Sequence, residues 1–100
     1  MNKDIVIVNY SDKSMSLDYS CLEEDGLWMK LNLKEVTASG EGKDYTKAEQ
    51  EAQLYLIKNA LSKSTHFHKL ERVIGITQNI LFSEEEKVIK ITLKGYGVFE

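Results

Sequence analysis

The sequence predicts an α+β fold: an antiparallel β-sheet with its elements in the order β-β-β-α-β-β and one helix packed on one face. Three observations lead to this prediction. Segments of alternating apolar and polar residues lie before and after one longer segment of helical periodicity. The links between neighbouring strands are short, which favours antiparallel pairing. The 100 residues suffice for one small hydrophobic core, so we expect a single domain over residues 1–100.

Three strands are expected before the helix. The segment 4–10 has β-branched, apolar residues at both odd and even positions, which is typical of a short strand covered on both faces. Residues 15–21 and 27–33 each alternate apolar with polar side chains, which predicts two half-buried strands.

The link between the second and third strands predicts a hairpin. A three-residue loop at 24–26 sets Leu17 opposite Leu33 and Tyr19 opposite Leu31, so that the apolar side chains share one face. A two-residue turn would set apolar residues opposite polar ones. The pattern therefore favours the longer loop.

The helix is predicted at residues 46–63. Thr46 and Glu49 have the spacing of a capping box, which makes Thr46 the expected N-cap. Lys58 and Lys63 lie toward the end at which the helix dipole favours positive charge. The local signals for the two ends of the helix therefore agree with each other.

The apolar residues of this helix fall on two sides of a helical wheel. A helix that is apolar on two sides needs two neighbours, and the sheet supplies only one of them. The first side holds Ala48, Ala52, Tyr55 and Leu56, and the nearly opposite side holds Leu54, Ile57 and Leu61.

Two more strands are expected after the helix, at 70–82 and 87–98. A four-residue loop at 83–86 joins them and places Ile80 opposite Ile89, so that apolar side chains again meet on one face. The chain thus ends in a β-hairpin.

A glycine-containing turn at 37–44 leads into the helix. It does not form a phosphate-binding loop, because Asp44 stands where that motif needs a serine or threonine to hold magnesium. Ordinary turn chemistry, with glycines that end a strand, accounts for it. The turn and the helix after it also match a sequence pattern found in other proteins. The matching positions are Gly40, Glu41, Gly42, Asp44, Lys47, Ala48, Ala52, Lys58, Ala60 and Leu61.

This pattern resembles the strand-to-helix passage of two nucleic-acid-binding groups, the double-stranded RNA-binding domains and the phage single-strand annealing proteins. The resemblance implies contacts to nucleic acid through Lys30, Lys34, Lys43 and Lys47. The formal net charge of −3 argues against it, because binding to polyanions relies on clustered positive charge. Nucleic acid is therefore the second choice of partner.

No motif for catalysis or metal binding is complete. Cys21, the single cysteine, shares the apolar face of its strand with Met15, Leu17 and Tyr19, which is typical of a buried thiol and not of a nucleophile. His66 and His68 would share one side of a strand, but zinc sites need at least three protein ligands. We therefore expect no enzyme activity, no metal and no cofactor, and an uncharacterised enzyme is the third choice of function.

The sequence also favours the cytoplasm. One cysteine cannot form an intramolecular disulfide, so nothing indicates an oxidising compartment. The apolar run at 5–8 is too short for a signal peptide or a membrane span.

Trp28 is the strongest candidate for contact with another protein. The expected hairpin places it opposite Leu22 on the lysine- and serine-bearing face, and aromatic residues in such positions dominate interface energetics. We therefore predict a protein-interaction domain, such as an inhibitor, an immunity protein or a phage-type accessory protein, that binds another protein or forms a homodimer. Its predicted contact residues are Leu22, Trp28, Lys30, Leu54, Ile57 and Leu61.

Overall fold

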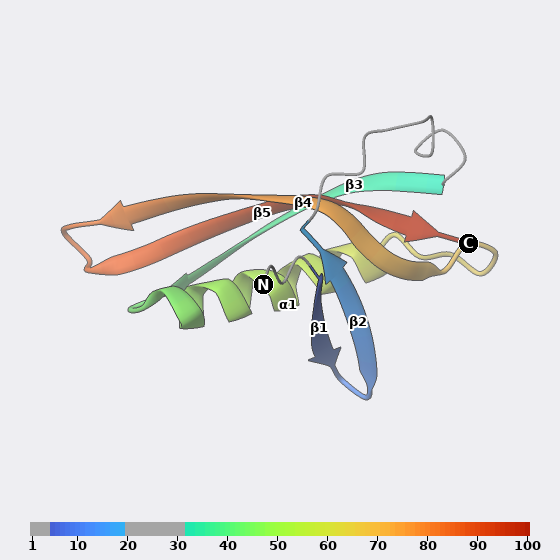
Figure 1. The fold of residues 1–100 in the computed structure, drawn as a ribbon, viewed down its shortest axis with the longest axis horizontal. Coiled ribbons are helices and arrows are strands. Elements are labelled where there is room, and N and C mark those ends of the chain that lie inside the picture. Colours follow the sequence, from blue (N-terminus) through green and yellow to red (C-terminus); the bar gives the residue numbers. More distant parts are fainter. Residues whose placement is uncertain (1–4, 20–31) are drawn as a thin grey trace.

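The computed structural model describes residues 5–19 and 32–100. It confirms the α+β class and the predicted order of the elements along the chain (Figure 1). The elements are β1 (Ile5–Tyr10), β2 (Lys13–Asp18), β3 (Asn32–Gly42), α1 (Tyr45–Leu61), β4 (Leu70–Ser83) and β5 (Val88–Phe99).

The five strands form one mixed sheet in the order β1-β2-β4-β5-β3. β2 and β4 are parallel and meet at Leu17 and Val73, so the prediction of a purely antiparallel sheet is wrong. A parallel pair needs a long connection, and the chain between β2 and β4 supplies one because it passes through β3 and α1. Sequence order alone therefore did not determine which strands are neighbours.

The predicted pairing of Leu17 with Leu33 is also wrong. Leu17 pairs with Val6 of β1, and Leu33 pairs with Val98 of β5. All four of these strands carry apolar residues that can face a core, so the apolar pattern by itself could not choose among the partners. The loop predicted at 24–26 lies outside the described residues.

The β4–β5 hairpin has the predicted partners in a different register. Ile80 pairs with Ile91 instead of Ile89, because the loop runs from 84 to 87. Lys87 has a φ of 59°, a left-handed conformation that ends the strand, and its N–H donates to the carbonyl of Ser83. Both registers place isoleucine opposite isoleucine, which is why the pattern could not separate them.

The start of α1 differs from its prediction in two ways. β3 continues through Gly42, so most of the segment 37–44 is strand and not turn. The N-cap is Asp44, whose carboxylate accepts a hydrogen bond from the N–H of Lys47 at 2.9 Å, and Thr46 lies inside the helix. Aspartate fills this role as well as threonine does, so the residue types alone did not show which of the two residues is the N-cap.

The helix buries one broad face, not two separate ones. Gln53 lies inside this face, and the polar residue divides the apolar pattern into the two stripes seen on the wheel. Tyr55 and Leu54 are exposed, contrary to the expected placement of Tyr55 beside Ala48. The buried residues of α1 are Ala48, Ala52, Gln53, Leu56, Ile57 and Ala60.

The hydrophobic core joins these residues of α1 to buried residues of β2, β3, β4 and β5. Gly40 is essential to the contact with β3, because a Cβ atom there would lie 2.2 Å from the backbone nitrogen of Ala52. Figure 1 shows the β1–β2 hairpin turned away from the long hairpin of β4 and β5. The two hairpins present different edges of the sheet to their surroundings.

Candidate protein-binding site

β1 lies at one edge of the sheet and pairs only with β2 among the described strands. Its side chains alternate, with Val6 and Val8 half-buried and Ile5 and Ile7 exposed. The exposure of Ile7, 62%, contradicts the expectation of a strand covered on both faces. An edge strand without charge, proline or bulge leaves its backbone open to another strand, and no residue of Ile5–Tyr10 is charged or proline.

The opposite edge of the sheet, β3, is protected by side chains of α1. The N–H of Glu41 donates to the carboxylate of Glu51 at 2.9 Å. The side-chain amide of Asn59 donates to the carbonyl of Thr37 at 2.9 Å. These backbone groups are therefore already occupied on β3, whereas no such side-chain contact reaches the backbone of β1 within the described part of the chain.

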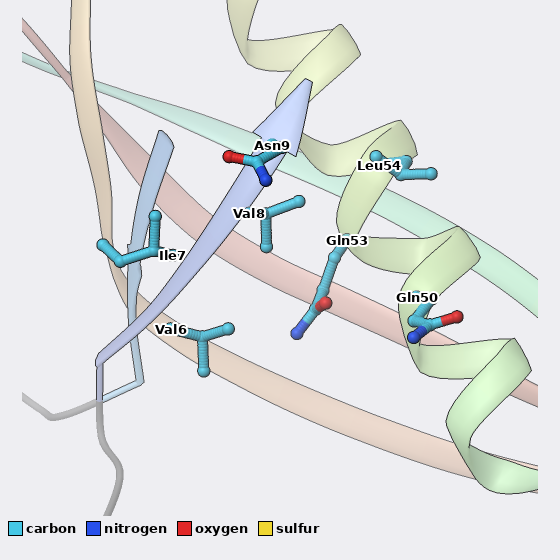
Figure 2. Close-up of a pocket in the computed structure, with 7 residues that line it drawn as sticks. All are labelled: Val6, Ile7, Val8, Asn9, Gln50, Gln53 and Leu54. Atoms are coloured by element: carbon cyan, nitrogen blue, oxygen red, sulfur yellow. The ribbon is translucent and has the colours of Figure 1, made fainter. Parts of the chain in front are cut away.

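A groove of about 360 Å³ lies between β1 and α1 (Figure 2). We call it the β1–α1 groove. The residues that line it within the described part of the chain are uncharged: Val6, Ile7, Val8, Asn9, Gln50, Gln53 and Leu54.

The groove is lined by four consecutive residues of β1, whose side chains lie on both faces of the strand. In Figure 2, Val6 and Val8 point toward α1, whereas Ile7 lies on the other side of the strand. The side chain of Asn9 accepts a hydrogen bond from the hydroxyl of Ser14 on β2. Because successive side chains of a strand alternate between its faces, Ile7 and Asn9 border the groove through their backbone.

The helical wall combines an apolar surface with an amide. Leu54 is exposed, and Gln53 is only 7% exposed. The Nε2 atom of Gln53 donates to the hydroxyl of Tyr19 at 2.9 Å. Its Oε1 atom has no partner among the residues described, and a buried amide oxygen favours a hydrogen-bond donor nearby. A segment bound in the groove could supply that donor.

Burial raises the pKa of the Tyr19 phenol above its ordinary value of 10.0, and the nearby Glu49 adds to the shift, while the hydrogen bond from Gln53 acts in the opposite direction. The folded state therefore favours the neutral phenol. Its contribution to the free energy of unfolding is fully present below pH 10 and is lost as the pH rises through the folded pKa.

We expect Tyr19→Phe to lower the free energy of unfolding by about 1–2 kcal/mol at pH 7, because Gln53 then loses its hydrogen-bond partner. Urea denaturation from pH 8 to pH 11 measures both effects. The variant should lose less stability than the parent protein above pH 10, since lysines titrate equally in both. Equal losses in the two proteins would contradict the role of Tyr19.

The structure separates the helix residues that we predicted as protein contacts. Leu54 lines the β1–α1 groove. Ile57 is fully buried in the core, and Leu61 is half-buried against it, so neither presents an open surface comparable with that of Leu54. The other predicted contacts, Leu22, Trp28 and Lys30, lie outside the described residues.

The lysines implied by the nucleic-acid resemblance do not converge on one surface. Lys34 lies near the start of β3, with its amino group 5.0 Å from the centre of the Phe99 ring. Lys43 lies just beyond the other end of β3, about 30 Å from Lys34 along an extended strand, and Lys47 lies in the first turn of α1. Lys30 is outside the described part of the chain.

Sequence reasoning missed Val6, Val8, Gln50 and Gln53. The valines were interpreted as part of a strand buried on both faces, and nothing in the local pattern marks a strand as an edge. Gln53 did leave a signal, because it is a polar residue within the apolar arc of a helix. Such a residue indicates a buried polar contact only when the facing element is known.

Neither a metal site nor a membrane-spanning helix emerges from residues 5–19 and 32–100. His68 contacts the carbonyl of Glu100 through Nδ1 at 2.9 Å, and His66 packs edge-on against Phe67. No group of three or more metal-ligating side chains comes together in these ranges. The helix found there is not long and apolar enough to cross a membrane.

Comparison of the chain with protein-family models, with curated proteins and with solved structures found no match. The geometry of the site is therefore the basis for the proposal that follows.

Proposed function

We propose that this chain is a non-catalytic protein-binding domain that adds an extended segment of another protein to β1, inside the β1–α1 groove. The observation that carries the proposal is an uncharged edge strand whose backbone borders a helix-lined groove. In strand addition, main-chain hydrogen bonds provide affinity and pockets for alternate side chains provide specificity. Both components are available here.

The chemistry of the groove defines the segment that it would accept. None of the described side chains that line it is charged, so a charged residue facing α1 would lose hydration without gaining a partner among them. Aliphatic residues suit the surfaces of Val6, Val8 and Leu54. A hydroxyl or amide side chain suits the Oε1 atom of Gln53, which has no hydrogen-bond partner in residues 5–19 and 32–100. The preferred ligand is thus an uncharged, β-branched segment.

β1 itself has this composition, so self-association through two copies of β1 is the alternative form of the same function. Either form is compatible with an inhibitor, an immunity protein or a phage-encoded accessory protein in the cytoplasm. The affinity in both forms comes from backbone groups that no described strand or side chain occupies. Sedimentation analysis separates the two forms, because only self-association changes the mass with protein concentration.

Leu54→Asp tests the groove. A selection from random eight-residue peptides should yield uncharged ligands, and their affinity for the variant, measured by fluorescence anisotropy, should fall at least about tenfold, because the new carboxylate is desolvated by the ligand. The matched control is Tyr55→Asp, at the next position of α1: Tyr55 is 45% exposed against 40% for Leu54, and it does not line the groove.

Tyr55→Asp should bind the selected peptides as the parent protein does. Circular dichroism should show the same helix content in both variants, since both positions are exposed. A protein that selects no peptide and sediments as a monomer at every concentration does not act by strand addition. Equal weakening by both variants would place the binding site elsewhere.

A further inference from the structure

The outer half of β4 has an open edge of its own. β5 pairs with β4 as far as Ser83, but on the other side β2 meets β4 only at the pair of Leu17 and Val73. No described strand lies along the remaining side of residues 77–83. We call this segment the outer β4 edge.

A bulge separates the two halves of β4. The register with β5 shifts between Ile74 and Thr77, and Gly75 has a φ of 61° at this point. An extra residue in a strand increases its local twist and bends it. The bulge therefore accounts for the separation of β4 from β2, and it leaves an edge, Thr-Gln-Asn-Ile-Leu-Phe-Ser, that contains no charge and no proline to prevent pairing.

Apolar side chains border this edge on both faces of the sheet. Ile80 and Phe82 are 46% and 59% exposed and share the face on which their β5 neighbours contact the core. Leu81 is exposed on the other face. On the first face, Tyr45 of α1 hydrogen-bonds to Gln78 and forms a wall beside the strand. An added strand would cover apolar surface on both faces.

Carboxylates outnumber cations near the outer β4 edge, where Lys90 and Lys94 of β5 lie opposite Leu81 and Thr77 and Lys94 is paired with Glu35. Glu84, Glu85 and Glu86 occupy the loop at its end, all are exposed, and no described residue forms an ion pair with any of them. Lys87 is the one cation in that loop, which leaves an excess of two negative charges. A fourth carboxylate, that of Glu49, lies beside Tyr45. A ligand with positive charge at one end would complement this arrangement.

We propose that the outer β4 edge is a second strand-addition site, distinct from the β1–α1 groove. Its ligand is an extended segment of another protein with alternating apolar residues, followed or preceded by lysine or arginine at the end that reaches Glu84–Glu86. A second copy of the same edge does not meet this description, because residues 73–86 contain no lysine or arginine. The partner is therefore a different, basic segment.

Synthetic peptides test the charge preference. The probes share the sequence Thr-Val-Thr-Val-Thr-Val and end in two lysines, two glutamines or two glutamates. Fluorescence anisotropy at low salt should show at least about tenfold tighter binding of the lysine form than of the glutamate form, and 0.5 M salt should reduce the difference because it screens exposed charges. Two further peptides are N-methylated at every second residue, one at the odd positions and one at the even positions. One of them should lose binding and the other should retain it.

Variants of the chain locate the site. Joint replacement Ile80→Thr and Phe82→Thr should weaken the lysine peptide at least about tenfold while retaining strand propensity. Joint replacement of Glu84, Glu85 and Glu86 by Gln should remove the preference for lysine. Phe67→Thr is the matched control, because Phe67 is 82% exposed and lies outside every strand.

Leu54→Asp distinguishes this site from the β1–α1 groove. It should leave the affinity for the lysine peptide unchanged. If Leu54→Asp weakens that affinity and the β4 variant does not, the groove is the site and the second site does not exist, although strand addition still does. Equal affinity for all three peptides, or no binding of any of them, also overturns the second site and leaves the groove to be judged by its own ligands.

Discussion

Gly40→Ala is expected to destabilise the fold by about 3 kcal/mol or more. A Cβ atom at this position would lie 2.2 Å from the nitrogen of Ala52 and 2.5 Å from the carbonyl oxygen of Ala48. Both are backbone atoms of α1, so no rotamer change relieves the overlap and the helix itself must move away from β3. Urea denaturation followed by circular dichroism measures the loss.

Gly97→Ala is the matched control, since it makes the same chemical change on another strand. A Cβ atom at Gly97 meets only the side chains of Phe99 and Leu70, at 2.8 and 2.9 Å, and side chains can rearrange. Its cost should be clearly smaller than that of Gly40→Ala. Equal costs would show that the backbone of α1 does not lie against Gly40 in solution.

Leu56→Ala is expected to lower the free energy of unfolding by about 3 kcal/mol, through lost burial and the cavity left behind. Leu56 is fully buried in the core cluster. Leu54→Ala, two residues away on the same helix, should cost less than about 1 kcal/mol, because Leu54 is 40% exposed and Leu56 is fully buried. Thermal or urea denaturation of both variants gives the comparison.

The pair also tests the orientation of α1. The sequence assigned Leu54 and Leu56 to opposite apolar sides, and the structure buries Leu56 together with Ile57 but leaves Leu54 exposed. Similar losses for both variants would mean that the helix is covered on two sides, in which case the β1–α1 groove would be closed. A large loss for Leu56→Ala alone leaves Leu54 available for binding.

Two uncharged edges on one sheet suggest how the chain would act on its partners. The β1 edge borders a groove whose described lining residues are uncharged, and the outer β4 edge ends at three carboxylates that form no ion pair with a described residue. The two sites would therefore select different segments. A chain that binds one segment at each edge would hold two partners on one continuous sheet.

The sequence by itself determined most of the local elements of this protein, although it placed the strand before the helix at 27–33, which shares only residues 32 and 33 with β3. The 3.6-residue period of Ala48, Ala52 and Leu56, with helix-favouring residues around them, identifies α1 within two residues at each end. The alternation in the last third of the chain identifies β4, β5 and the hairpin between them. These features depend on residues close in sequence, so a single chain displays them directly.

Only the tertiary structure decided which strand lies beside which. Leu17 lies between Val6, 11 residues before it, and Val73, 56 residues after it. Both partners are valines, and other strands that Leu17 does not pair with also contain valine. Alternation specifies which face of a strand is apolar, but it contains no information about its neighbour. The open edges at Ile7 and Ile80, and hence the candidate binding sites, follow from that choice of neighbours.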